Sequence, residues 1–281
     1  MHTLLSDKAL LWLGAVLYLG GFAAGCYSLS RRQQSGLSLT LLNTLLAFGL
    51  ATQTAGLYAR GLTVGGCPLG NKFEIVQFVA WSAMVLYFVV GPSFRVSLLG
   101  LFTAGYASIL AFLSLVIPQW DLTRGVKIFG NNPWIEFHAA LAVFSYGVFG
   151  LLAITSLMYL LQNWSLKHKN LGNLFWFLPS MSQLDQITFR LLLAGVSILS
   201  LALCVGATNW VQNFATVDHT KLAVTLGVWS AYLAALLLRW RHRLVSTRFA
   251  WVCVGMFLVA MLSLGPVNSS RHHQEPTPTS R

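Results

Sequence analysis

A tryptophan and a histidine stand one helical turn apart near the start of a long apolar run. Trp134 and His138 are four residues apart, so a helix would place them on one face. Ionisable side chains are costly within membrane spans and are more often functional there than in soluble cores. A neutral imidazole is also a common protein ligand of haem iron. Both a metal ligand and a satisfied interfacial histidine are compatible with this spacing.

A second group of chemically capable residues flanks a short polar interruption between two later apolar runs. The first run ends at Trp210, and the next begins with Asp218, His219 and Lys221. A cation, aromatic faces and an imidazole together suit a flat, anionic, apolar ligand, of which haem is one example. The aromatic residues of this region are equally compatible with interfacial or packing roles.

A third group, residues 66–74, has the pattern of a capped helix start. Pro68 and Gly70 mark a turn. Asn71 is placed to cap the helix that follows, and Glu74 falls in its first turn, where a negative charge suits the helix dipole. We therefore expect this segment to hold the beginning of a helix.

The composition of the chain identifies the elements that must position these residues. Of 281 residues, 56% are hydrophobic and only 9% are charged, whereas soluble domains carry roughly 25% charged residues. This excludes an ordinary soluble enzyme, a disordered protein and a secreted disulfide scaffold. We predict an all-α polytopic membrane protein, because a bilayer core needs about 20 apolar residues per helix. Eight runs qualify, at 9–29, 38–59, 73–91, 97–117, 134–161, 189–210, 219–239 and 249–265, followed by a tail, 266–281, that is expected to be disordered.

The net charge of +11 follows the loops between these runs. Basic clusters, above all Arg239–Arg248, alternate with less basic loops, which is typical of the positive-inside bias of membrane proteins and does not point to nucleic acid. With eight spans, both termini are expected to face outward, together with loops 60–72, 118–133 and 211–218. The middles of the spans almost lack Asp, Glu, Lys and Arg, which disfavours an ion-coupled transporter.

Taken in the order in which they occur along the chain, the three groups resemble the cytochrome c assembly family of membrane proteins. This family includes CcsA, CcmC, HemX and the YpjD-like proteins. Residues 66–81 are similar to a family segment after the second span. The helix that carries His138 is similar to the one whose outer histidine is a haem ligand in CcsA. The stretch 206–240 stands in the place of the tryptophan-rich outer segment and the helix after it.

This chain also departs from the family pattern. Only Trp210, Asp218 and Lys221 echo the tryptophan-rich signature, and the usual inner histidine of the next helix has no match. His242 stands a few residues later, and His272 and His273 stand in the tail, without an assignable role. These departures make the chain more similar to the HemX and YpjD-like branch than to a haem lyase.

The resemblance implies a bacterial inner-membrane protein that handles haem in cytochrome c biogenesis without covalent chemistry of its own. It implies non-covalent haem b, with His138 on the iron, His219 as a further candidate ligand, and Trp134, Trp210, Asp218 and Lys221 around the macrocycle. The implied partners are membrane lipid, a ResB/CcsB-like accessory protein and apocytochrome c. Two alternatives remain open: a HemX-type regulator or assembly scaffold, and an ion-coupled transporter.

Overall fold

The computed structural model describes residues 6–30, 36–94, 97–122, 132–168, 179–212, 219–241, 243–244 and 246–269. Within these ranges the chain is helical and contains no strand, which confirms the all-α prediction. The helices are α1 (Asp7–Ser30), α2 (Gly36–Val64), α3 (Lys72–Phe94), α4 (Ser97–Val116), the short 3₁₀ helix η1 (Pro118–Asp121), α5 (Pro133–Lys167), α7 (Met181–Gln212), α8 (His219–Trp240) and α9 (Ser246–Ser269).

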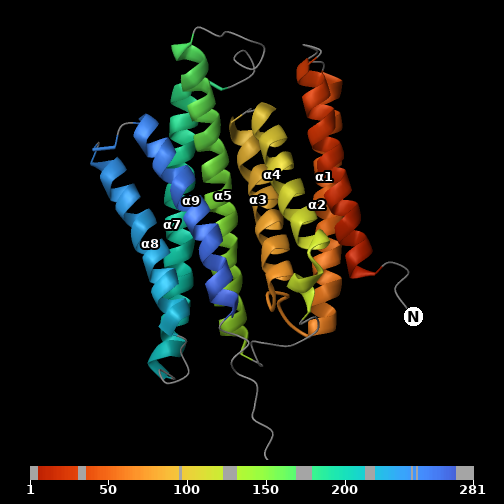
Figure 1. The fold of residues 1–281 in the computed structure, drawn as a ribbon, viewed down its shortest axis with the longest axis vertical. Coiled ribbons are helices and arrows are strands. Elements are labelled where there is room, and N and C mark those ends of the chain that lie inside the picture. Colours follow the sequence, from red (N-terminus) through yellow and green to blue (C-terminus); the bar gives the residue numbers. More distant parts are fainter. Residues whose placement is uncertain are drawn as a thin grey trace, which may run out of the picture.

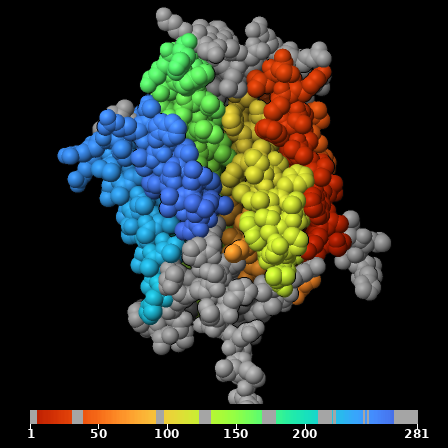
Figure 2. Space-filling view, viewed as in Figure 1, coloured from red at the N-terminus to blue at the C-terminus, as the bar shows by residue number. Residues whose placement is uncertain are grey.

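The long helices run up and down in one bundle with two halves (Figures 1 and 2). One half holds α1, α2, α3 and α4, and the other holds α5, α7, α8 and α9. The longest helix, α5, lies at the centre, because it packs against α7, α9 and α3. This places the start of α5, and the residues it carries, where both halves meet.

Seven of the described helices are long and apolar enough to cross a membrane: α1, α3, α4, α5, α7, α8 and α9. This makes the chain a multi-pass membrane protein. The second expected span, 38–59, falls within α2, which has 29 residues but is not among the seven. Its crossing of the bilayer stays a prediction. The expected disordered tail begins inside α9, and residues 270–281 lie outside the described part of the chain.

The bundle has two chemically different ends. We call the end that holds the starts of α1, α3, α5 and α8 the histidine end, because His138 and His219 lie there (Figure 1). The opposite end, which we call the arginine end, holds Arg239. The start of α1 and the end of α9 both lie toward the histidine end, as expected of eight long helices that run alternately up and down within the described residues. Which side of the membrane this end faces stays a prediction.

Small residues allow the two halves to approach closely. Gly147 of α5 lies so near α3 that a Cβ there would overlap the Ser82 hydroxyl and meet the Ala83 backbone nitrogen at 3.0 Å. Close backbone approach at small residues is how helices associate where lipid removes the hydrophobic driving force. This crossing fixes α5 against α3.

A buried hydrogen-bond chain joins the four helices of the first half. The Tyr18 hydroxyl donates to Gln53 Oε1 at 2.8 Å, Gln53 Nε2 donates to Gln77 Oε1 at 2.8 Å, and Gln77 Nε2 donates to Ser114 Oγ at 2.9 Å. All four side chains are almost fully buried. Polar groups away from water are costly unless paired, so this chain ties α1, α2, α3 and α4 into one specific arrangement.

Candidate functional site

His138 lies in the second turn of α5 and faces α7. Asn132 caps the helix by accepting a hydrogen bond from the Trp134 backbone N–H at 3.0 Å, and Pro133 follows at the first helical position. The Nδ1 atom of His138 lies 2.6 Å from the carbonyl oxygen of Ala202. A carbonyl only accepts, so Nδ1 carries the proton, and the lone pair of the neutral ring lies on Nε2. Metal-ligating histidines are held by this type of hydrogen bond.

Trp134 lies one turn before His138 and is 64% exposed. Its ring is therefore not buried in the helical core, and its place four residues before His138 puts the two residues on one face of α5. This agrees with the expected shared face and places an aromatic surface at the rim of the histidine end.

The predicted partners of His138 come from the corner between α7 and α8. Trp210 stands eight residues after Ala202 in α7, which is about 12 Å along the helix toward the histidine end. His219 begins α8 and is exposed. Asp218 lies outside the described residues, and the side chains of Trp210 and Lys221 are not described either. The structure thus brings the helix ends of both groups to one end of the bundle.

Two aromatic residues of α8, Trp229 and Tyr232, pack inside the bundle. Trp229 donates through Nε1 to Ser200 Oγ of α7 at 2.8 Å. Tyr232 is buried and stacks on Phe149 of α5, with ring centroids 3.7 Å apart. They hold α8 against α7 and α5, so their role here is in packing.

A buried ion cluster, which sequence reasoning missed, lies at the same end. Arg60 of α2 is fully buried. Its guanidinium donates to Asp7 of α1 at 3.0 Å, to Glu74 of α3 at 2.7 Å, and to Asp121 of η1. Lys8 also pairs with Asp121, at 2.7 Å. Two cations therefore face three carboxylates from four different elements.

The cluster holds its charges in place by mutual pairing. Burial alone would raise the pKa of Asp121, but the hydrogen bonds and positive charges of Lys8 and Arg60 outweigh burial and lower it. The Arg60 guanidinium also lies over the Phe73 ring, 4.6 Å from its centroid. Loss of one partner would leave the others charged and buried, so the cluster fixes the ends of α1, α2, α3 and η1.

The loop between α2 and α3 connects this cluster to α5. Asn71 accepts from the Glu74 N–H at 2.9 Å, which confirms the predicted helix cap. Glu74 uses its second oxygen to accept from the Gly70 N–H at 2.6 Å. The Cys67 N–H donates to Glu136 Oε2 of α5 at 3.2 Å. Arg60 is thus linked through Glu74 and the loop backbone to Glu136, which lies two positions before His138.

The sequence analysis placed position 60 only at the start of an outward loop, 60–72, and treated Glu74 as a dipole partner. The available signal was the run of apolar residues on both sides of Arg60, since a charge at the edge of a span needs a partner. The spacing alone did not identify Asp7 and Asp121 as those partners, because they come from distant parts of the chain.

The imidazole of His138 has the chemistry of a haem-iron ligand. The porphyrin supplies four iron ligands, so a single imidazole with a fixed lone pair on Nε2 is a sufficient protein ligand. Among the described residues, no three His, Cys, Asp or Glu side chains are grouped to hold a bare metal ion. His242, His272 and His273 lie outside the described residues.

The fold and these contacts define a multi-pass helical membrane protein with a polar, histidine-bearing end. The chain belongs to the cytochrome c assembly protein family, whose model matches residues 69–273. It is similar to HemX of Brevibacillus brevis, with 32% identity over 57% of this chain and 61% of that protein. It is also similar to HemX of Bacillus subtilis, with 26% identity over 78% and 80%, and to CcsA of Trichormus variabilis, with 23% identity over 59% and 46%. The chain thus spans about three fifths of the first of these relatives and under half of the last.

Proposed function

We propose that this protein binds haem at the histidine end and takes part in cytochrome c biogenesis. Membership of the cytochrome c assembly family and the similarity to a protein named CcsA support the role. The observation that carries the site is the hydrogen bond from His138 Nδ1 to the Ala202 carbonyl, which leaves Nε2 as the basic nitrogen. Haem would supply the iron and its redox chemistry.

Each residue has a distinct part in the proposed site. His138 ligates the iron, and α7 holds its ring in orientation through Ala202. His219 is a second candidate ligand, because α8 begins at the same end. Trp134 and Trp210 shield the macrocycle. Lys221 neutralises a propionate, and Asp218 orients the corner between α7 and α8. The side-chain roles of Trp210, Asp218 and Lys221 are carried over from the family resemblance alone.

The proposed setting is the bacterial inner membrane, with the histidine end and both termini on the outer side. The cofactor is non-covalent haem b. The protein binds and presents it, and attachment to apocytochrome c requires a ResB/CcsB-like accessory partner. The chain itself performs no covalent step in this proposal.

A second candidate function is a HemX-type regulator or membrane assembly scaffold that does not deliver haem. The similarity to HemX of Bacillus subtilis, which covers 78% of this chain, favours it. Stable co-purification of a partner membrane protein without any tetrapyrrole would select this function.

Purification of the protein with haem tests the proposal directly. Wild type should show a Soret band, and His138→Ala should lose most of it. The matched control is His168→Ala, because His168 also has Nδ1 against a backbone carbonyl, that of Trp164 at 3.0 Å, but stands about 45 Å away along α5. Equal haem content in wild type and His138→Ala contradicts the site.

A further inference from the structure

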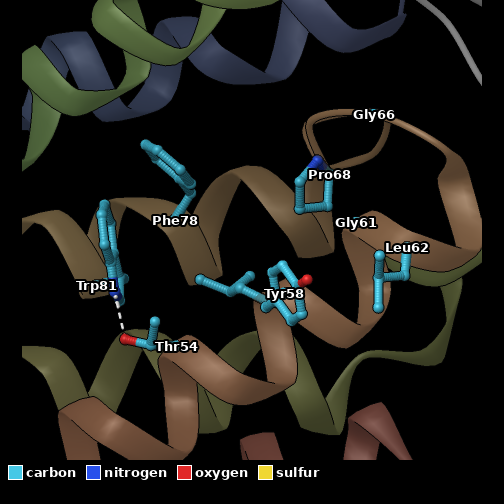
Figure 3. Close-up of a pocket in the computed structure, with 9 residues that line it drawn as sticks. Thr54, Tyr58, Gly61, Leu62, Gly66, Pro68, Phe78 and Trp81 are labelled. Carbon is cyan, nitrogen blue, oxygen red and sulfur yellow. Dashed lines mark hydrogen bonds between the residues drawn. The ribbon is translucent and has the colours of Figure 1, made fainter.

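A crevice of about 390 Å³ lies between α2 and α3 at the histidine end. One face of α2, Thr54–Leu62, forms one wall, and Phe78 and Trp81 of α3 form the other (Figure 3). Gly66 and Pro68 of the connecting loop close its outer end. The lining is therefore mostly apolar, and the loop closes one end.

Two polar groups inside the crevice, the Trp81 indole N–H and the Thr54 hydroxyl, bond to each other. Trp81 Nε1 donates to Thr54 Oγ1 at 2.8 Å, as the dashed line in Figure 3 marks. The Trp81 ring also packs edge-on against Phe144 of α5, with centroids 6.4 Å apart. A ligand at this depth meets aromatic and aliphatic surface, which suits a hydrocarbon chain.

The crevice opens sideways, toward the surroundings of the bundle. Tyr58 and Leu62, on its α2 wall, are 68% and 66% exposed. The other wall belongs to α3, one of the candidate membrane spans, so lipid is expected around the crevice at this depth. From Lys72, where α3 begins, to Trp81 is about 14 Å of helix. This matches the half-thickness of a bilayer core, about 15 Å, and therefore one leaflet's acyl chain.

A carboxylate stands at the outer end of the crevice. Glu136 lies directly against Gly66, in the space that a Cβ there would occupy. Its Oε2 accepts from the Cys67 N–H at 3.2 Å. No cation is paired with it among the ion pairs of the described residues. The crevice thus combines an apolar body one leaflet deep with a negative charge at the membrane surface.

We propose that this crevice binds one phospholipid with a primary ammonium headgroup. One of its acyl chains lies along Trp81 and Phe78, and its ammonium group pairs with Glu136. Complementary charge at the headgroup distinguishes this lipid from anionic ones, which Glu136 repels.

The lipid site lies on the opposite side of α5 from the proposed haem site. Glu136 and His138 are two residues apart, which is about 200° around a helix. Glu136 accordingly contacts the loop of the first half, whereas His138 contacts α7. The lipid proposal therefore does not depend on haem binding.

Fluorescence quenching by brominated lipids tests the site. The full-length protein is reconstituted in phosphatidylglycerol bilayers that contain increasing fractions of phosphatidylethanolamine brominated on its acyl chains, and the converse series carries bromine on phosphatidylglycerol. The Trp81 signal is the difference between wild type and Trp81→Phe. We expect brominated phosphatidylethanolamine to quench Trp81 at fractions about tenfold lower than brominated phosphatidylglycerol does. A charge-assisted hydrogen bond changes a binding constant by more than a factor of ten.

Substitution of Glu136 tests whether this carboxylate causes the headgroup preference. Glu136→Gln should remove the tenfold preference, whereas Asp185→Asn, a matched change of acid to amide at the arginine end, should preserve it. Thermal unfolding of each variant, measured in bilayers of one fixed lipid composition, checks that the bundle is intact. Equal quenching by both lipids in wild type, or an unchanged preference in Glu136→Gln, overturns the proposal.

Discussion

Removal of the Arg60 charge should destabilise the protein far more than removal of a comparable charge elsewhere. Arg60→Met keeps a long apolar stem but deletes the guanidinium that donates to Asp7, Glu74 and Asp121. Lys8 then remains as the single cation of the cluster for three buried carboxylates. All three carboxylates would have to stay charged in buried, low-dielectric surroundings or take up protons.

The expected size of the effect follows from burial. Removing one partner of a buried ion pair costs about 3–5 kcal/mol, because the other partner is left uncompensated. Arg239→Met at the arginine end is the matched control: Arg239 pairs with Asp185, and their side chains are 16% and 29% exposed. Pairs within reach of water contribute about 0–1 kcal/mol. The two variants should therefore differ by several kcal/mol.

Thermal unfolding in detergent, followed by tryptophan fluorescence and size exclusion, measures the difference. Arg60→Met should lower the unfolding temperature by on the order of 10 °C, and Arg239→Met by a few degrees at most. The deficit of Arg60→Met should shrink as pH falls, because protonation neutralises the uncompensated carboxylates. Adding Glu74→Gln to Arg60→Met should recover part of the loss.

Equal destabilisation by Arg60→Met and Arg239→Met would refute the reasoning. It would mean that water reaches the Arg60 cluster and screens its charges. A deficit of Arg60→Met that grows as pH falls would refute it as well, because the carboxylates would then not be the source of the loss.

Three further predictions follow from other contacts. In wild type, the pKa of Asp121 is lower in the folded protein than its unfolded value near 3.8, so its carboxylate stabilises the fold at pH values above 3.8. Unfolding measured as a function of pH should show that this contribution is lost as the pH falls through the lower folded pKa. Gly147→Ala should cost about 1–3 kcal/mol in thermal unfolding, because its Cβ meets Ser82, whereas Gly227→Ala, which points into open space, should be neutral. Burial and the charges of Glu136 and Glu74 raise the pKa of Cys67 to about 11, so its maleimide labelling should be slow at pH 8 and rise about tenfold per pH unit, and rapid labelling at pH 8 would contradict this.

The helical class follows from apolar length alone. Runs of about 20 apolar residues leave a chain in lipid no other way to satisfy its backbone. The cap at Asn71 was also predictable, because capping is a local interaction between residues three apart. The extent of α5 was less so: its 35 residues run past the apolar stretch at 134–161 as far as Lys167.

Tertiary contacts limited the prediction of the site. Arg60 pairs with residues 53 and 61 positions away in the chain. Likewise, the partner of His138 is a backbone carbonyl 64 residues later, and every residue carries such a group. A sequence pattern marks a side chain that needs a partner, but the packing of α5 against α7 decides which group meets it.

The buried chain of Tyr18, Gln53, Gln77 and Ser114 shows the same limit. Each residue is a polar interruption in an apolar run, which indicates an inward-facing position. Their order across α1 to α4 depends on the register of four helices, and this register is set by contacts such as Gly14 of α1 against α2. Spacing within one helix carries no information about it.

The central claim is that His138 is the protein ligand of haem iron, and chemical rescue tests it most directly. Purified His138→Gly is incubated with excess haem and titrated with free imidazole, while the bound haem and its visible and electron paramagnetic resonance spectra are recorded. We predict that His138→Gly has an altered iron spectrum and that imidazole restores the wild-type one. A His138→Gly spectrum identical to wild type before imidazole is added would contradict the assignment.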